Sequence, residues 1–162
     1  MKACYPGTFD PITNGHLDII ERSARIFDEV DVLIMTNPRK INVFTEEERK
    51  KMIEKSLAML PGVKNVHVLI GAGLTVDFAR KIKAEAIVRG IRAVSDYEYE
   101  LQQATANQML DDTIETLFFI ARPAYSFLSS SVVREIAANG GSIASMVPAA
   151  IQEMVIDKLK KR

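Results

Sequence analysis

Five short apolar runs, rich in β-branched residues, alternate with longer amphipathic segments along the chain. The runs cover residues 3–5, 30–35, 66–70, 86–88 and 117–121, and their lengths are typical of buried strands. Strands that alternate with helices in this way form a parallel sheet. The pattern therefore predicts an α/β fold, with one doubly wound, Rossmann-like domain over residues 1–162 and a five-stranded parallel sheet flanked by helices.

Capping signals predict the starts of two helices. Thr45 stands three residues before Glu48, and Ser95 stands three residues before Glu98, which is the spacing of a capping box. We expect the second of these helices to run to about Met109. Apolar residues at helical spacing mark two further helices, with Leu17, Ile20, Ala24 and Phe27 in the first and Phe78 and Ile82 in the second.

Two more helices are expected near the C-terminus. Ser131 precedes the first, which should stop at residues 139–141, because the Asn-Gly-Gly sequence favours the left-handed conformation that ends helices. Pro148 suits the first turn of the second, a C-terminal helix with Ile151, Val155 and Leu159 facing inward. Cations at its C-terminal end match the helix dipole, and these are Lys158, Lys160, Lys161 and Arg162.

Composition narrows the possible partners. The chain has 162 residues, of which 48% are hydrophobic, enough to bury the core of one ordinary domain. Lys and Arg total 21 and Asp and Glu total 21, so no overall basic field favours nucleic acid. No apolar run approaches the roughly 20 residues that span a bilayer, and no signal peptide is recognised. The single cysteine, Cys4, is expected to be a buried thiol, and the chain is expected in the reducing cytoplasm.

The strongest functional signal is the segment 5–16, YPGTFDPITNGH. It places two glycines, two threonines and a histidine between a predicted strand and a predicted helix. Backbone N–H groups at a helix start favour phosphate oxygens, and glycine lets a ligand approach the backbone closely. The segment therefore predicts a phosphate site, with His16 placed where charge would develop.

Three further loops follow predicted strands and carry basic or hydroxyl side chains. Segment 88–92 flanks Gly90 with Arg89 and Arg92, segment 126–131 ends in three serines, and Lys40 follows the second strand. Alone, each is explained by a solvated charge or a helix cap. Ligands bind at the carboxyl ends of strands in such sheets, so four loops of this kind at one edge favour an anion site.

Other patterns point to structure only. Segment 71–76, GAGLTV, half matches a dinucleotide fingerprint, but Val76 stands where the third glycine belongs. A P-loop sequence is absent from the chain. His67 alternates with valines on a strand and should be exposed, and the charged run 46–51 should be a solvated helix face.

The combined motifs resemble bacterial phosphopantetheine adenylyltransferases, from the first strand to the last helix. They are GTFDP at 7–11, TNGH at 13–16, RGIR at 89–92, EYE at 98–100 and SSS at 129–131. This family belongs with nucleotidyltransferases whose motif is commonly His-x-Gly-His, and Thr13 takes the place of the first histidine, as is usual in the family. The resemblance implies transfer of AMP from ATP to 4'-phosphopantetheine, giving dephospho-coenzyme A and pyrophosphate, with Mg²⁺ and in a homohexamer.

The resemblance also implies residue roles. His16 would contact the α-phosphate in the transition state, Thr8 would orient the attacking phosphate, and Lys40 and Arg92 would complete the catalytic set. The substrate-binding residues would be Thr8, Lys40, Thr75 and Arg89. The ATP-binding residues would be Thr8, Phe9, His16, Gly90, Ile91, Arg92, Glu100, Tyr125, Ser126, Phe127, Leu128, Ser129, Ser130 and Ser131. No residue is implied as a metal ligand, and Gly73, Thr75 and Tyr125 depart from the pattern of the family.

Two other functions share part of this signal. An adenylyl- or cytidylyltransferase for another phosphorylated small molecule would have the same opening segment and serines, although Lys40, Arg89 and Arg92 favour phosphopantetheine. A non-catalytic nucleotide sensor on the same fold would have little need of His16. The first alternative differs in its acceptor, and the second lacks turnover.

Overall fold

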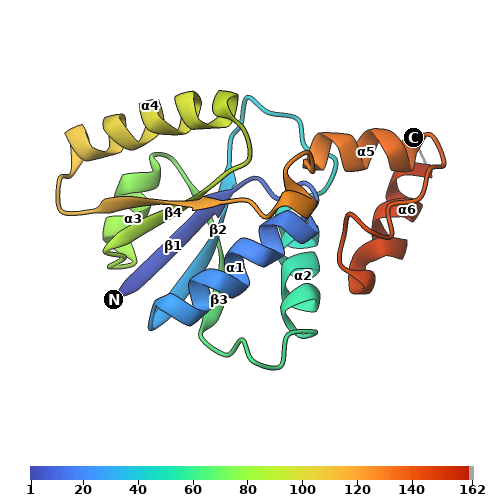
Figure 1. Cartoon of the computed structure of the whole chain (residues 1–162), viewed down its shortest axis with the longest axis horizontal. Helices are drawn as coiled ribbons and strands as arrows, with labels where there is room; N and C mark the ends of the chain where they lie inside the picture. The colour runs from blue at the N-terminus through green and yellow to red at the C-terminus, as the bar shows by residue number, and fades with distance from the viewer. Residues whose placement is uncertain (161–162) are drawn as a thin grey trace.

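The computed structural model describes residues 1–160, and its strands pair in parallel in one sheet of order β3-β2-β1-β4-β5 (Figure 1). The strands are β1 (Lys2–Gly7), β2 (Glu29–Thr36), β3 (Val66–Ala72), β4 (Ala86–Ile91) and β5 (Glu115–Ile120). Because the order reverses direction at β1, the sheet is doubly wound. The predicted α/β fold with five parallel strands is confirmed, and each strand is one or more residues longer than its apolar run.

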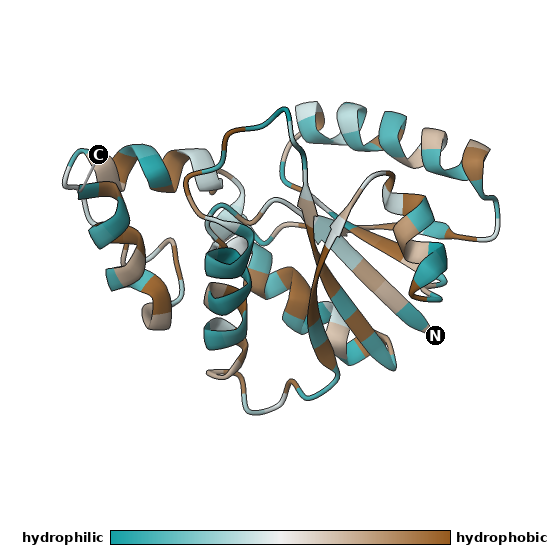
Figure 2. Ribbon diagram, turned by 180° about the vertical axis from the view of Figure 1, so that it is seen from behind, coloured by the Kyte–Doolittle hydropathy of each residue, from teal (hydrophilic) through white to brown (hydrophobic). Residues whose placement is uncertain are grey.

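Helices cover both faces of the sheet (Figure 1). On one face lie α1 (Asn14–Ile26) and α2 (Glu46–Leu57), and on the other lie α3 (Thr75–Lys81) and α4 (Val94–Leu110). Side chains of β1 alternate between the two: Ala3 and Tyr5 pack with the α1 and α2 side, and Cys4 with the α3 side. Figure 2 shows the apolar residues concentrated in the strands between these helix layers.

The C-terminal part of the chain forms a small helical group beside the sheet, next to α2 (Figure 1). It consists of η1 (Pro123–Tyr125), α5 (Ser130–Ala138), η2 (Ala149–Ile151) and α6 (Gln152–Lys160). The inward positions expected for the last helix, Ile151, Val155 and Leu159, are buried. Pro148 was expected in the first turn of one C-terminal helix. It instead precedes the short helix η2, which continues into α6. The expected basic residues Lys161 and Arg162 lie outside the described residues.

Two of the predicted helix starts are wrong in detail. The Thr45 capping box is confirmed, because the Glu48 N–H donates to Thr45 Oγ1 and the Thr45 N–H donates to Glu48 Oε2. The Ser95 box does not form: α4 follows Ala93 and has no side-chain cap. Helix α5 begins at Ser130 after Ser129, not after Ser131, because Ser129 Oγ accepts the Val132 N–H.

The structure also bears on the expectations for Cys4 and for segment 71–76. Burial raises the pKa of the Cys4 thiol to about 12, so it stays protonated and acts as a small apolar side chain. At Gly71 an added Cβ would lie 2.5 Å from the Phe78 ring, so this glycine lets α3 pack closely on β3. Segment 71–76 thus has a structural reason for its first glycine.

Among residues 1–160, no helix combines the length and apolar content that crossing a bilayer requires.

Candidate active site

Two adjoining cavities open where β1 and β4 end. The first, of about 270 Å³, is lined by the start of α1, the start of α5 and the end of β4. The second, of about 640 Å³, lies toward α4 and the loop after β2. Their shared wall consists of Pro6, Gly7, Thr8, Lys40 and Arg89. The structure thus brings the four loops singled out in the sequence to one place.

The first cavity is built on the tight turn after β1. Phe9 has a φ of 50°, and its ring lies beneath Gly7, where an added Cβ would come within 2.9 Å of ring atom Cζ. The same ring packs edge-on against Tyr5, at 5.4 Å, and against His16, at 5.1 Å between centroids. Phe9 is expected at the nucleotide, and its ring also packs against the His16 imidazole and helps to fix its position.

The orientation of His16 is set by the cap of α1. The Thr13 N–H donates to His16 Nδ1 at 3.0 Å, and the His16 N–H donates to Thr13 Oγ1 at 3.3 Å, so His16 stands where a capping box usually has Glu. A ring nitrogen that accepts a hydrogen bond carries no proton, so in the neutral ring the proton is on Nε2. Thr13 and His16 together thus create a ring with one free N–H donor.

Burial, and after it the positive charges of Arg92 and Arg89, together lower the pKa of His16 to about 4. The ring is therefore neutral at physiological pH. An NMR titration of the ligand-free protein is expected to place the His16 midpoint near pH 4, against an ordinary value of 6.5. Between these two pH values the unfolded chain binds a proton that the folded ring resists, so stability falls as the pH falls through this window. A midpoint near 6.5 would contradict the buried setting of the ring, and a proton on Nδ1 would contradict the cap geometry.

The shared wall carries a cation and a hydroxyl that face each other. Lys40 Nζ lies 3.5 Å from Thr8 Oγ1, and Thr8 comes from the β1 turn whereas Lys40 comes from the loop after β2. Lys40 is exposed, as a group that receives a ligand from solvent must be. A phosphate between the two cavities would meet both side chains.

Arg89 is held in that wall by two fixed acceptors. Its guanidinium makes a bidentate pair with Glu100, at 2.6 and 2.7 Å, and donates to the Pro6 carbonyl. Burial alone would lower the pKa of Arg89, but the Glu100 carboxylate raises it above its ordinary value, so the guanidinium stays charged. Glu100, which the resemblance places at the nucleotide, lines the first cavity, and its carboxylate engages Arg89.

On the far side of the first cavity lie Arg92 and the start of α5. Arg92 pairs with Asp96 at 2.9 Å and donates to the Leu128 carbonyl at 2.7 Å, which ties β4 to the loop before α5. Ser129, Ser130 and Ser131 line the cavity at the N-terminus of α5. Helix starts favour anions, and those of both α1 and α5 border this cavity.

The remaining expected residues divide by position. Gly90, Tyr125 and Leu128 line the first cavity, and Thr75 lines the second. Ile91 is buried, and Ser126 is not among the residues that line either cavity. The Phe127 side chain is 94% exposed and also lies outside both linings.

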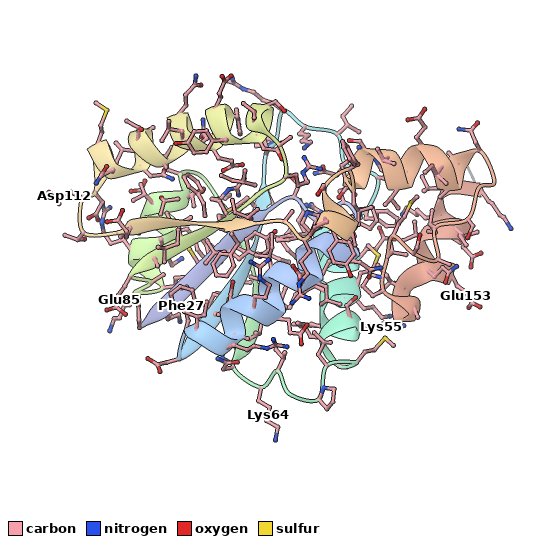
Figure 3. The ribbon with its side chains drawn as sticks, viewed as in Figure 1. Phe27, Lys55, Lys64, Glu85, Asp112 and Glu153 are labelled. Carbon is pink, nitrogen blue, oxygen red and sulfur yellow. The ribbon has the colours of Figure 1, made fainter. Side chains whose placement is uncertain are left out.

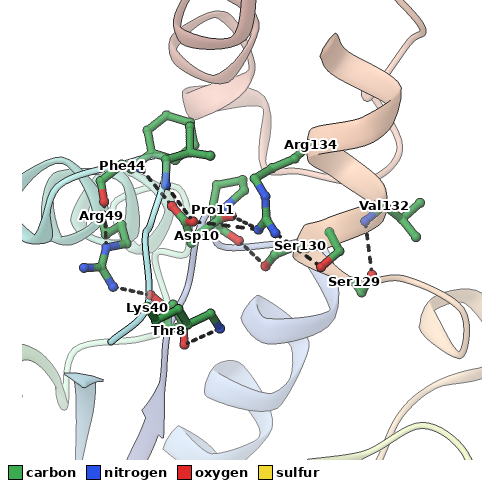
Figure 4. A network of polar contacts seen from close by, with 12 residues as sticks. Thr8, Asp10, Pro11, Lys40, Phe44, Arg49, Ser129, Ser130, Val132 and Arg134 are labelled. Atoms are coloured by element: carbon green, nitrogen blue, oxygen red, sulfur yellow. Dashed lines mark hydrogen bonds and ion pairs between the residues drawn. The ribbon is translucent and has the colours of Figure 1, made fainter. Parts of the chain in front are cut away.

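Three residues near the site had no role predicted from the sequence, although Asp10 belongs to the GTFDP motif (Figure 4). The Asp10 carboxylate accepts the Val43 and Phe44 N–H groups, and Arg134, which lines the first cavity, donates to the Asp10 carbonyl at 2.6 Å. Arg49 is only 1% exposed, so the expectation that 46–51 is a solvated face is wrong at this position. Its spacing offered a signal, because it stands three and four residues before the buried Met52 and Ile53.

Metal ligands are scarce here. Within the part of the chain that the structure describes, no three His, Cys, Asp or Glu side chains form a group that could hold a metal ion. Asp10, Asp96 and Glu100 line the first cavity, but arginines engage the carboxylates of Asp96 and Glu100, and two backbone N–H groups engage that of Asp10. The side chains therefore do not fit a metal site made by the protein alone.

Comparison with known proteins gives consistent results. The family model described as cytidylyltransferase-like matches residues 4–136. A protein named phosphopantetheine adenylyltransferase from Finegoldia magna is 52% identical over 161 residues, which cover 99% of this chain and 95% of the relative. A protein of the same name from Dictyoglomus thermophilum is 50% identical, over 98% of this chain and 94% of the relative.

One solved structure supports the fold independently. It is a crystal structure from Vibrio parahaemolyticus, described as a candidate nicotinate-nucleotide adenylyltransferase, with a TM-score of 0.74 and 16% identity. The match covers 99% of this chain and 95% of that chain. At this identity the likeness concerns the fold alone.

Proposed function

This chain belongs to the phosphopantetheine adenylyltransferase family, and we propose that its two adjoining cavities hold ATP and 4'-phosphopantetheine for transfer of AMP between them. The products are dephospho-coenzyme A and pyrophosphate. The observation that carries this proposal is the shared wall. Thr8, Lys40 and Arg89 border both cavities, so a phosphate placed against them would lie between a nucleotide in one cavity and an acceptor arm in the other.

The acceptor phosphate needs little activation. A phosphate monoester has a second pKa of about 6 and is largely dianionic at neutral pH, so one of its oxygens attacks the α-phosphorus of ATP without a protein base. A new P–O–P bridge forms between the acceptor phosphate and the α-phosphate. At the same time the bond breaks between the α-phosphorus and the oxygen that joins it to the β-phosphorus. Pyrophosphate leaves with that electron pair. In this reaction Thr8 and Lys40 aim the attacking phosphate, and Arg89 neutralises part of its charge.

The protein then stabilises charge in the transition state. His16 donates from Nε2 to an α-phosphate oxygen, because Nδ1 is engaged by the Thr13 N–H. Arg92 and the N-terminus of α5 take up charge on the leaving pyrophosphate, and Ser129 to Ser131 supply hydroxyl donors there. Preorganised donors of this kind typically contribute about 10²- to 10³-fold each to the rate.

Three further features belong to the proposal. Magnesium is expected from the family resemblance alone, and the role of each residue above stands without it. A cytoplasmic location fits the single cysteine, which cannot form an internal disulfide. Self-association is supported by the apolar side chains that α4 leaves exposed outside the cavities, and six copies are expected from the family resemblance alone; these side chains are Val94, Tyr97, Leu101, Met109 and Leu110.

An acceptor comparison tests the proposed function. The protein is incubated with ATP and Mg²⁺ plus 4'-phosphopantetheine, nicotinamide mononucleotide or no acceptor, and pyrophosphate release is measured. Release that depends on phosphopantetheine is expected, with dephospho-coenzyme A formed in equal amount. Release with nicotinamide mononucleotide instead would support the transferase alternative, and binding of ATP without release in any arm would support the sensor.

A further inference from the structure

We propose that Asp10 and Arg49 are positioning residues that set the gap between Thr8 and Lys40, and so shape the subsite for the acceptor phosphate. The inference rests on the proposed function. Neither side chain lines the second cavity, where the acceptor arm would lie, and of the two only Asp10 lines the first. Their effect is on two segments that come from distant parts of the sequence and must meet at the shared wall (Figure 4).

Asp10 joins the two segments through its carboxylate. It is 4% exposed, and its two oxygens accept the Val43 and Phe44 N–H groups, each at 2.9 Å. Asp10 stands two residues after Thr8, and Val43 stands three residues after Lys40. Hydrogen bonds to a charged acceptor are stronger than those between neutral groups. The carboxylate therefore fixes the end of the Lys40 loop against the β1 turn.

Arg49 makes a second connection between the same segments. Its Nε donates to the Phe44 carbonyl at 3.1 Å, and its NH1 group donates to the Thr8 carbonyl at 2.8 Å. The planar guanidinium holds both carbonyls at a set separation, which a lysine ammonium could not do. Asp10 and Arg49 thus close a ring that runs through Thr8 and Phe44.

The ring matters because the rest of the Lys40 loop has little support. Residues 38–41 are exposed, and Lys40 is held on its other side by the turn in which its N–H donates to the Asn37 carbonyl at 2.9 Å. Three residues of extended chain reach at most about 10 Å, so fixing Val43 limits where Lys40 can stand. Loss of the hydrogen bonds to Asp10 would let the Lys40 ammonium occupy a wider range of positions.

A buried carboxylate could serve stability alone, and the two roles predict different kinetics. A purely structural Asp10 would lower the amount of folded enzyme and leave both Michaelis constants unchanged. A positioning Asp10 changes the affinity for phosphopantetheine, because Lys40 and Thr8 meet the acceptor. It changes the affinity for ATP much less, because Arg134, which lies 3.8 Å from the Asp10 carboxylate in the first cavity, is also held by the Asp10 backbone carbonyl at 2.6 Å. The ratio of the two effects separates the roles.

The test is Asp10→Asn in the full chain, with both Michaelis constants measured on folded protein. The amide oxygen of the asparagine can accept a hydrogen bond from one of the two loop N–H groups. The NH₂ group would face the second N–H group and cannot accept a hydrogen bond from it. We expect the KM for phosphopantetheine to rise about 10-fold or more and the KM for ATP to change less than about 2-fold. Asp111→Asn is the matched control, because Asp111 accepts the Thr113 N–H in a loop that borders neither cavity.

A double-mutant cycle with Lys40→Ala shows whether Asp10 acts through Lys40. In the Lys40→Ala background, Asp10→Asn should change the KM for phosphopantetheine far less than in the wild type. Equal rises in both Michaelis constants, or an equal effect in both backgrounds, would overturn the inference while leaving the proposed function intact. Wild-type enzyme that does not use phosphopantetheine overturns the proposed function itself.

Hydrogen exchange gives a second readout if Asp10→Asn does not fold. In the wild type, phosphopantetheine should slow exchange of the Val43 and Phe44 amides, because it fixes the loop through Lys40. ATP alone should slow them much less. Equal protection by the two substrates, or none by phosphopantetheine, would also overturn the inference.

Discussion

His16→Ala is expected to lower kcat by at least about 10²- to 10³-fold, the cost of losing one transition-state donor, and to abolish measurable turnover if the donor acts alone at the α-phosphate. The dissociation constant for ATP should stay within a few-fold, because Arg92 and the start of α5 also border that cavity. Pre-steady-state turnover and calorimetric ATP binding measure the two quantities. The split arises because the Nε2 donor is aimed at charge that develops during the reaction.

The matched control is His67→Ala. His67 is the other histidine of the chain, lies on β3 with a 57% exposed side chain, and borders neither cavity. Its loss should leave kcat unchanged. Unchanged turnover in His16→Ala would remove His16 from the mechanism, and equal losses of turnover and ATP affinity would assign it to binding alone.

Lys40→Ala is expected to raise the KM for phosphopantetheine by about 10- to 100-fold, the range for a hydrogen bond to a charged group, while the KM for ATP changes little. The reason is the position of Lys40 at the shared wall, 3.5 Å from Thr8 and at the edge of the second cavity. Initial rates with each substrate varied in turn give both constants.

Lys55→Ala controls for the loss of one positive charge. Lys55 lies on α2, has an exposed side chain and borders neither cavity (Figure 3). Both Michaelis constants should match those of the wild type. If Lys40→Ala raises the two constants equally, Lys40 does not belong to the acceptor subsite.

Much of the fold could be predicted because local patterns determine it. Strand alternation predicted the parallel sheet, and the Thr45 capping box formed because its two hydrogen bonds join residues three positions apart. The Ser95 box had the same spacing but did not form. At that turn the Asp96 carboxylate instead accepts hydrogen bonds from the Arg92 backbone N–H and the Arg92 guanidinium. A local signal is decisive only where no other group competes for the same turn.

The predicted site residues came together because strand ends share one edge of a parallel sheet. Their supports could not be predicted, since Asp10 meets Phe44 across 34 positions and Arg134 meets Asp10 across 124. Arg49 was hidden in a run of charges, although its spacing before Met52 placed it on the buried face. The roles of the site residues stay predictions until the variants above are measured.

Direct attack by the acceptor phosphate is the central step of the proposed mechanism. The alternative is a covalent intermediate on His16, which the cap geometry disfavours: Nδ1 accepts the Thr13 N–H and Nε2 carries the proton, so the neutral ring has no free lone pair. The most direct test uses ATP made chiral at the α-phosphorus with oxygen isotopes. Inversion of configuration in dephospho-coenzyme A is predicted from a single in-line displacement, and retention would contradict it by requiring two displacements.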